Sequence, residues 1–172
     1  MQITVNGNPC LPWDPFLTGH RMTQELSEER LPCSGEEILV QAYVLPHRDH
    51  LDEETQIRAA GPKGWNLQQG FYIYRAERLI VAGGWFGSGA AKPEEHTKLA
   101  RVRVDLTQGM DSAWHLNVLK SEARPPASLR KDFGRIGQAV RSDAKKAYQY
   151  RGKKAIGKLK HSPAIPMWTA EQ

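Results

Sequence analysis

The chain has 172 residues, 40% of them hydrophobic and 25% charged, and a net charge of +5, a composition that is typical of one globular domain and excludes wholesale disorder. No apolar run approaches the ~20 residues of a membrane span and the first residues form no signal peptide, so we expect a cytoplasmic protein without a membrane contact. Cys10 and Cys33 are the only cysteines, too few for a disulfide framework or a cysteine-based zinc site.

The middle of the chain alternates strand and helix patterns. Residues 36–45 are rich in β-branched and aromatic side chains and predict a strand. Residues 52–60 predict a short helix, which a following Gly-Pro pair ends. The clearest local pattern is a β-hairpin formed by strands 69–75 and 78–82.

Three further elements follow in the second half. Residues 99–106 alternate apolar and basic side chains and predict a strand with Arg101 and Arg103 on its exposed face. Residues 113–120 predict another strand, which ends at a lysine. Residues 129–150 carry apolar side chains at intervals of three and four, so they predict a long amphipathic helix with a basic outer face.

The order of these elements, strands first and one long helix late, predicts an α+β domain with a mixed or mostly antiparallel sheet. We expect this domain to span residues 1–152. Residues 153–172 are rich in Lys, Gly and Pro without periodicity, which indicates an irregular tail or the start of a following domain.

Charge is distributed unevenly along the chain. Residues 120–160 hold thirteen Lys and Arg against three acidic residues, whereas residues 1–119 have a net charge of −4. Three interpretations stay open: a helix face that binds nucleic acid such as DNA, a helix that docks onto an acidic partner domain, and an ordinary solvated face. The candidate nucleic-acid contacts are Arg135, Arg141, Lys145, Lys146, Lys153 and Lys154.

A metal site is another alternative, which would make the chain a stand-alone enzyme. His47, His50 and Asp52 lie within six residues and offer nitrogen and oxygen ligands. A solvated loop explains them as well, because no fourth ligand stands nearby. No nucleophile motif or phosphate-cradling loop is complete, so the sequence assigns no catalytic residue.

Several short motifs follow one another in a specific order. They are Val5-Asn6-Gly7, Trp13-Asp14-Pro15-Phe16, Val44-Leu45-Pro46-His47, Gly61-Pro62-Lys63-Gly64-Trp65, Gln69-Gly70-Phe71-Tyr72-Ile73-Tyr74-Arg75, Arg78-Leu79-Ile80, Glu94-Glu95-His96, Leu99-Ala100-Arg101 and Lys120-Ser121-Glu122-Ala123-Arg124-Pro125-Pro126. This series covers most of residues 1–152 and resembles bacterial ATP-binding proteins of the GHKL superfamily, which also holds gyrase, MutL, the heat-shock chaperone ATPases and the MORC proteins. The hairpin in particular is similar to their "GFYIYRNxRLI" segment.

The resemblance implies a transducer domain with a ribosomal-protein-like fold that contains a left-handed βαβ unit. In that superfamily the transducer follows the ATP-binding domain and supplies a lysine to the γ-phosphate of ATP. Lys120 is the implied lysine, because the strand before it resembles the "DVNVHPxK" strand of MutL. Two residues fewer separate Asn-Val from the lysine here, and Lys98 is the second candidate.

The same resemblance implies what lies outside the chain. The Glu/Asn helix, the DxGxG motif and the glycine-rich lid that bind ATP and Mg in that superfamily do not occur in residues 1–172. We therefore expect a fragment that works with an upstream ATP-binding domain, within a parent ATPase that can form a homodimer. By itself the fragment is not expected to hydrolyse ATP.

Overall fold

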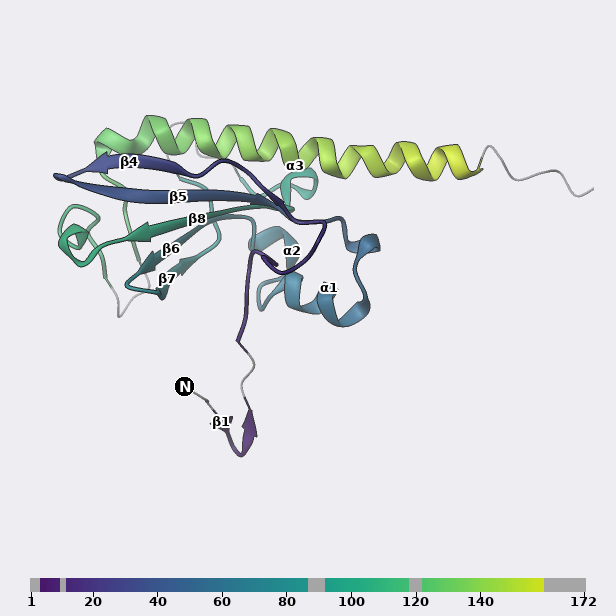
Figure 1. Ribbon diagram of the computed structural model, residues 1–172, viewed down its shortest axis with the longest axis horizontal. Helices are drawn as coiled ribbons and strands as arrows, with labels where there is room; N and C mark the ends of the chain where they lie inside the picture. The colour runs from purple at the N-terminus through teal and green to yellow at the C-terminus, as the bar shows by residue number, and fades with distance from the viewer. Residues whose placement is uncertain (1–3, 10–11, 87–91, 118–121, 160–172) are drawn as a thin grey trace, which may run out of the picture.

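A six-stranded sheet carries a long helix along one face, and a small N-terminal hairpin stands apart from it (Figure 1). The computed structural model describes residues 4–9, 12–86, 92–117 and 122–159, with side chains up to residue 150. The elements in chain order are β1 (Thr4–Val5), β2 (Asn8–Pro9), β3 (Gln24–Glu25), β4 (Glu29–Cys33), β5 (Glu36–Val44), η1 (Arg48–His50), α1 (Glu53–Ala60), α2 (Gly64–Leu67), β6 (Gly70–Arg75), β7 (Arg78–Ala82), η2 (Glu95–Thr97), β8 (Ala100–Leu106), η3 (Gln108–Met110), η4 (Ala127–Leu129) and α3 (Arg130–Leu159).

The large sheet is mixed, which confirms the predicted α+β class. Strand β5 pairs antiparallel with β3, β4 and β8, and β6 pairs antiparallel with β7. Strands β6 and β8 are parallel neighbours. They are connected by β7 and residues 83–99, and the described part of 83–99 contains no helix except the 3-10 turn η2.

Local chemistry explains two elements that the sequence predicts correctly. In the hairpin turn, Ala76 and Glu77 both have positive φ, 46° and 65°, which matches the twist of the two strands without the usual Gly or Asn. Helix α1 is capped at its N-terminus by Asp52, whose carboxylate accepts a hydrogen bond from the Thr55 amide at 2.8 Å. It is capped at its C-terminus by Gly61, which adopts a φ of 63°.

Helix α3 covers one face of the sheet and builds the main core. Its buried side chains are Phe133, Ile136, Val140 and Ala144, which pack against Ile38, Val40, Phe71, Ile73, Val102 and Val104 of the sheet. The ring of Phe133 meets that of Phe71 edge-on at 5.2 Å. This apolar stripe is the one that the predicted amphipathic helix presents. Among the described residues, no helix combines the length and apolar character of a membrane span.

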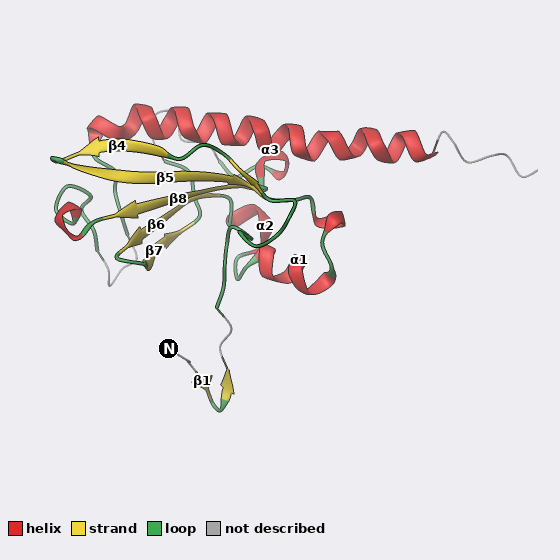
Figure 2. Ribbon diagram, viewed as in Figure 1, coloured by secondary structure: helices red, strands yellow, loops and turns green. Residues whose placement is uncertain are grey.

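Helix α3 also extends beyond its predicted end. The expected helix stops near Tyr150, whereas α3 continues without a break to Leu159 and projects past the sheet (Figure 2). The irregular segment expected from 153 onward is therefore helical over its first residues. The division of the chain into 1–152 and 153–172 stays a prediction.

The opposite face of the sheet carries a smaller aromatic cluster. Phe16 stacks on Tyr43 with ring centroids 4.9 Å apart and meets Tyr72 edge-on at 5.2 Å. Arg101 also lies on this face and is completely buried, so the prediction of an exposed Arg101 is wrong. The N-terminal segment and α1 cover this end of the sheet, and alternation within one strand does not reveal such a cover. Arg103 is half-buried and lies over the Tyr74 ring.

The predicted strand at 113–120 is wrong for its described part. Residues 111–115 form turns instead. The Trp114 amide donates to the Met110 carbonyl at 3.0 Å and the Leu116 amide to Asp111 at 3.0 Å. His115 adopts a φ of 46°, which is incompatible with a strand. Hydrogen bonds within residues 110–116 thus replace the expected pairing with a neighbouring strand.

Candidate functional site

Lys120, the first candidate for a phosphate contact, lies outside the described residues, whereas the residues on either side of it are described. The Asn117 amide donates to the Glu122 carbonyl at 2.9 Å, and the Glu122 amide donates back to Asn117 at 3.1 Å. This reciprocal pair joins the two described residues that flank positions 118–121.

The described residues that flank positions 118–121 are anchored on helix α3. Trp114 is completely buried, and its indole meets the Phe133 ring edge-on at 5.6 Å. On the far side of positions 118–121, the Arg124 amide donates to the Trp114 carbonyl at 2.8 Å. The described residues on both sides of Lys120 thus connect to the first turns of α3 through the contact between Trp114 and Phe133.

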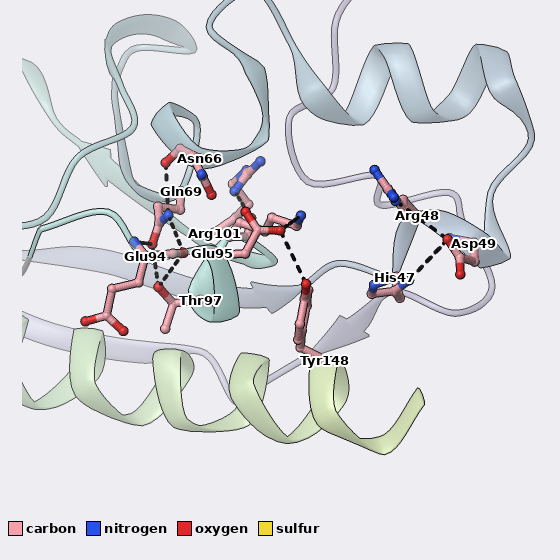
Figure 3. A network of polar contacts seen from close by, with 11 residues as sticks. His47, Arg48, Asp49, Asn66, Gln69, Glu94, Glu95, Thr97, Arg101 and Tyr148 are labelled. Atoms are coloured by element: carbon pink, nitrogen blue, oxygen red, sulfur yellow. Dashed lines mark hydrogen bonds and ion pairs between the residues drawn. The ribbon is translucent and has the colours of Figure 1, made fainter. Parts of the chain in front are cut away.

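Lys98, the second candidate, is engaged inside the protein. Its side chain is only 9% exposed, forms an ion pair with Glu95 and lies over the ring of Tyr148, 5.5 Å from its centroid. The Tyr148 hydroxyl donates to Glu95 at 3.3 Å (Figure 3). The hydrogen bond from Lys98 lowers the pKa of Glu95. Lys98 therefore tethers η2 to α3 and is not presented to an external phosphate.

The buried Gln69 side chain organises the connection between β7 and β8. Its amide nitrogen donates to the carbonyls of Asn66 at 2.9 Å and Glu94 at 3.0 Å. Its amide oxygen accepts from the Thr97 hydroxyl at 2.6 Å (Figure 3). The same oxygen also accepts from the indole of Trp85 at 3.2 Å. One side chain at the start of β6 thus holds both ends of residues 85–97.

The four predicted nucleic-acid residues whose side chains are described each have an acidic partner within the chain. Arg135 makes a two-pronged contact with Glu29 at 3.1 and 2.5 Å, and Lys146 binds Asp143 at 2.8 Å. The acidic partner of the basic helix is therefore in part the chain's own sheet. The side chains of the last two candidates, Lys153 and Lys154, are outside the described part.

Arg141 and Lys145 share one carboxylate. Glu94 accepts from Arg141 at 2.8 Å and from Lys145 at 3.2 Å. These contacts, led by the hydrogen bond from Lys145, lower the pKa of Glu94. Figure 3 shows the Glu94 side chain reaching from the η2 segment toward α3. The sequence pattern does not reveal this contact. The adjacent acidic pair Glu94-Glu95 is the one local feature that could have indicated an acidic partner for α3.

The three residues of the alternative metal site serve separate structural roles. His47 lies at the start of η1, where its ring nitrogen accepts from the Asp49 amide at 3.4 Å, while Asp52 caps α1. His50 ends η1 and is exposed. Within the described ranges, no group of three or more His, Cys, Asp or Glu side chains is arranged to hold a metal ion.

Arg101 is a buried cation that donates hydrogen bonds to three backbone carbonyls. Its guanidinium donates to Lys98 at 2.7 Å, Ala100 at 3.2 Å and Ala59 at 3.5 Å, while its Nε has no acceptor among the described residues. Burial lowers the pKa of this guanidinium. Arg101 links β8 to the end of α1, and we assign it a structural role.

Comparisons with protein-family models, curated proteins and solved structures give no match for this chain.

Proposed function

We propose that this chain is the transducer domain of a GHKL-type ATPase, which senses ATP bound in an upstream domain through Lys120. The single observation that carries the proposal is the link from Asn117 and Glu122, through Trp114, to Phe133 of α3. In this proposal, a contact between Lys120 and ATP is transmitted to α3 through this link between the residues that flank the lysine and Phe133.

The chemistry of the relay follows from the lysine. An ammonium group offers three donors and a compact charge, which suits the terminal phosphate of ATP. ATP and its Mg are held by the upstream domain, so this chain supplies only the lysine. Because the terminal phosphate is present in ATP and absent in ADP, the contact of Lys120 distinguishes the two states.

The finer fold assignment belongs to the same proposal. We infer a variant of the ribosomal-protein-like transducer fold, in which the described connection between the parallel strands β6 and β8 carries β7 and η2 where the left-handed βαβ unit has an α-helix. Two features support this inference: the parallel pair of β6 and β8 within an otherwise antiparallel sheet, and the long helix α3 packed across one face. The upstream ATP-binding domain is the expected partner, and dimerisation belongs to the parent protein.

The test compares Lys120→Ala with Lys131→Ala in the full-length protein. Lys131 is an exposed residue in the first turn of α3, so its variant controls for loss of one positive charge. We expect Lys120→Ala to lower ATP turnover by about 100-fold, as removal of a transition-state donor does elsewhere. It should also abolish the difference in α3 amide exchange between an ATP analogue and ADP.

Two outcomes overturn the proposal. One is a Lys120→Ala protein with unchanged turnover and an unchanged exchange difference. The other is a native polypeptide of 19.4 kDa on an antibody blot of source-cell lysate, because a lysine that acts on ATP within the same polypeptide requires a longer protein.

A further inference from the structure

Two cations of α3 are held by one exposed carboxylate. Arg141 and Lys145 lie one helical turn apart, and each binds a different oxygen of Glu94, at 2.8 and 3.2 Å. The Glu94 side chain is 46% exposed. Exposed ion pairs contribute little to stability, so a more highly charged anion can displace this carboxylate.

Arg141 packs against an aromatic ring, and one of its N–H donors has no hydrogen-bond acceptor among the described residues. Its guanidinium lies over the indole of Trp85, 5.6 Å from the ring centroid, and its side chain is 18% exposed. The Arg141 Nε is buried and has no acceptor among the described residues. A buried N–H without an acceptor costs free energy, and a ligand oxygen that reaches it recovers this cost.

The vacant donor favours a phosphate over a carboxylate as the ligand. Guanidinium groups bind phosphate through two parallel N–H bonds, and lysine adds a point charge. Glu94 divides its two oxygens between Arg141 and Lys145 and leaves the Arg141 Nε without an acceptor. A phosphate has a further oxygen, which is available for the third donor.

We propose that Arg141 and Lys145, backed by Trp85, form a binding site for a phosphate group, which Glu94 closes as an internal substitute for the ligand. Opening requires only that the Glu94 side chain turns away, because Gln69 holds its backbone carbonyl at 3.0 Å. The site is independent of Lys120. Its phosphate comes either from a nucleic-acid backbone or from a free phosphate compound.

The neighbouring glutamate provides a matched control. Glu95 binds Lys98 instead of the α3 cations, so Glu95→Gln removes one charge without releasing Arg141 or Lys145. The experiment titrates pyrophosphate by calorimetry, and a fluorescent 16-nucleotide single strand by anisotropy, into the wild type, Glu94→Gln and Glu95→Gln. Circular dichroism and the unfolding midpoint establish that each variant is folded.

We expect Glu94→Gln to bind at least one probe about tenfold more tightly than the wild type, and Glu95→Gln to stay within about twofold. A gain with both probes identifies a free phosphate ligand, and a gain with the oligonucleotide alone identifies a nucleic-acid backbone. Adding Arg141→Lys to Glu94→Gln should remove the gain, since lysine keeps the charge but loses the fork of donors.

Three results overturn the proposal. They are equal affinities of the wild type and Glu94→Gln for both probes, an equal gain in Glu95→Gln, and a gain that survives Arg141→Lys. The last two results would mean that affinity depends on the net charge of the protein and not on the geometry of Arg141 and Lys145. If Glu94→Gln is unfolded, the same titrations with Glu94→Asp decide, because its shorter carboxylate reaches α3 less well and predicts a smaller gain of the same sign.

Discussion

Trp114 and Phe133 meet edge to face, with ring centroids 5.6 Å apart and planes at 84°. Phe133 makes the same kind of contact with Phe71 and Phe86, at 5.2 and 5.4 Å. One side chain of α3 therefore joins the sheet, the end of the β7 segment and the loop that leads to Lys120. Loss of this ring should affect both stability and the proposed relay.

Phe133→Ala is the first prediction. Removing a fully buried aromatic ring leaves a cavity, so we expect the free energy of unfolding to fall by about 3–5 kcal/mol. Urea unfolding measures the change. Lys131→Ala, on the exposed side of the same helix, should stay within about 0.5 kcal/mol of the wild type. A Phe133→Ala loss below about 1 kcal/mol would contradict the packing described.

Gly70 and Gly84 give a matched pair for the second prediction. Both have positive φ, but a Cβ on Gly70 would lie 2.1 Å from the Gly84 carbonyl oxygen, whereas a Cβ on Gly84 meets no atom within 4 Å. We expect Gly70→Ala to cost more than about 4 kcal/mol, because backbone must move. Gly84→Ala should cost about 1–3 kcal/mol from backbone strain alone. Thermal unfolding of the two variants tests the order.

The elements that the sequence predicts correctly are those whose cause is local. Asp52 caps α1 three residues before its partner Thr55, and the hairpin turn lies between two strands that pair with each other. The core stripe of α3 repeats every three or four residues. In each case, residues that are close in sequence determine the structure.

The features that sequence reasoning misses depend on distant residues. Arg135 binds Glu29, 106 residues earlier, and Arg141 binds Glu94, 47 residues earlier. From its sequence alone, a basic helix face is expected to be exposed to solvent, because no local residue shows which carboxylates the fold places opposite it. The burial of Arg101 also depends on distant residues, since α1 and the N-terminal segment cover it. Residues 113–120 alternate as a strand does, so the sequence predicts a strand where the described residues 111–115 form turns.

The third prediction concerns Arg75 and Asp111, which form two hydrogen bonds of 2.6 Å. The hydrogen bonds from Arg75 lower the pKa of Asp111 below its ordinary value of 3.8. A depressed carboxyl pKa stabilises the fold above the ordinary value, and this contribution is lost as the pH falls through the lower, folded-state pKa. The urea midpoint of Asp111→Asn should lie below that of the wild type at pH 7, and the two should converge at low pH. Midpoints separated by a constant amount at every pH would contradict the pairing.

The fourth prediction concerns alkaline stability. Burial raises the pKa of Tyr74 from 10.0 to about 12, so the folded protein keeps this phenol protonated where the unfolded chain has lost the proton. Stability contributed by a raised pKa is present below the unfolded value and is lost as the pH rises above it. The wild type should therefore lose stability between pH 10.0 and about 12. Tyr74→Phe should lose less over this interval, measured by urea unfolding. Tyr150→Phe, which alters an exposed ring, should keep the wild-type fall. An equal fall in Tyr74→Phe and the wild type would show that the Tyr74 phenol is not buried against the aromatic cluster.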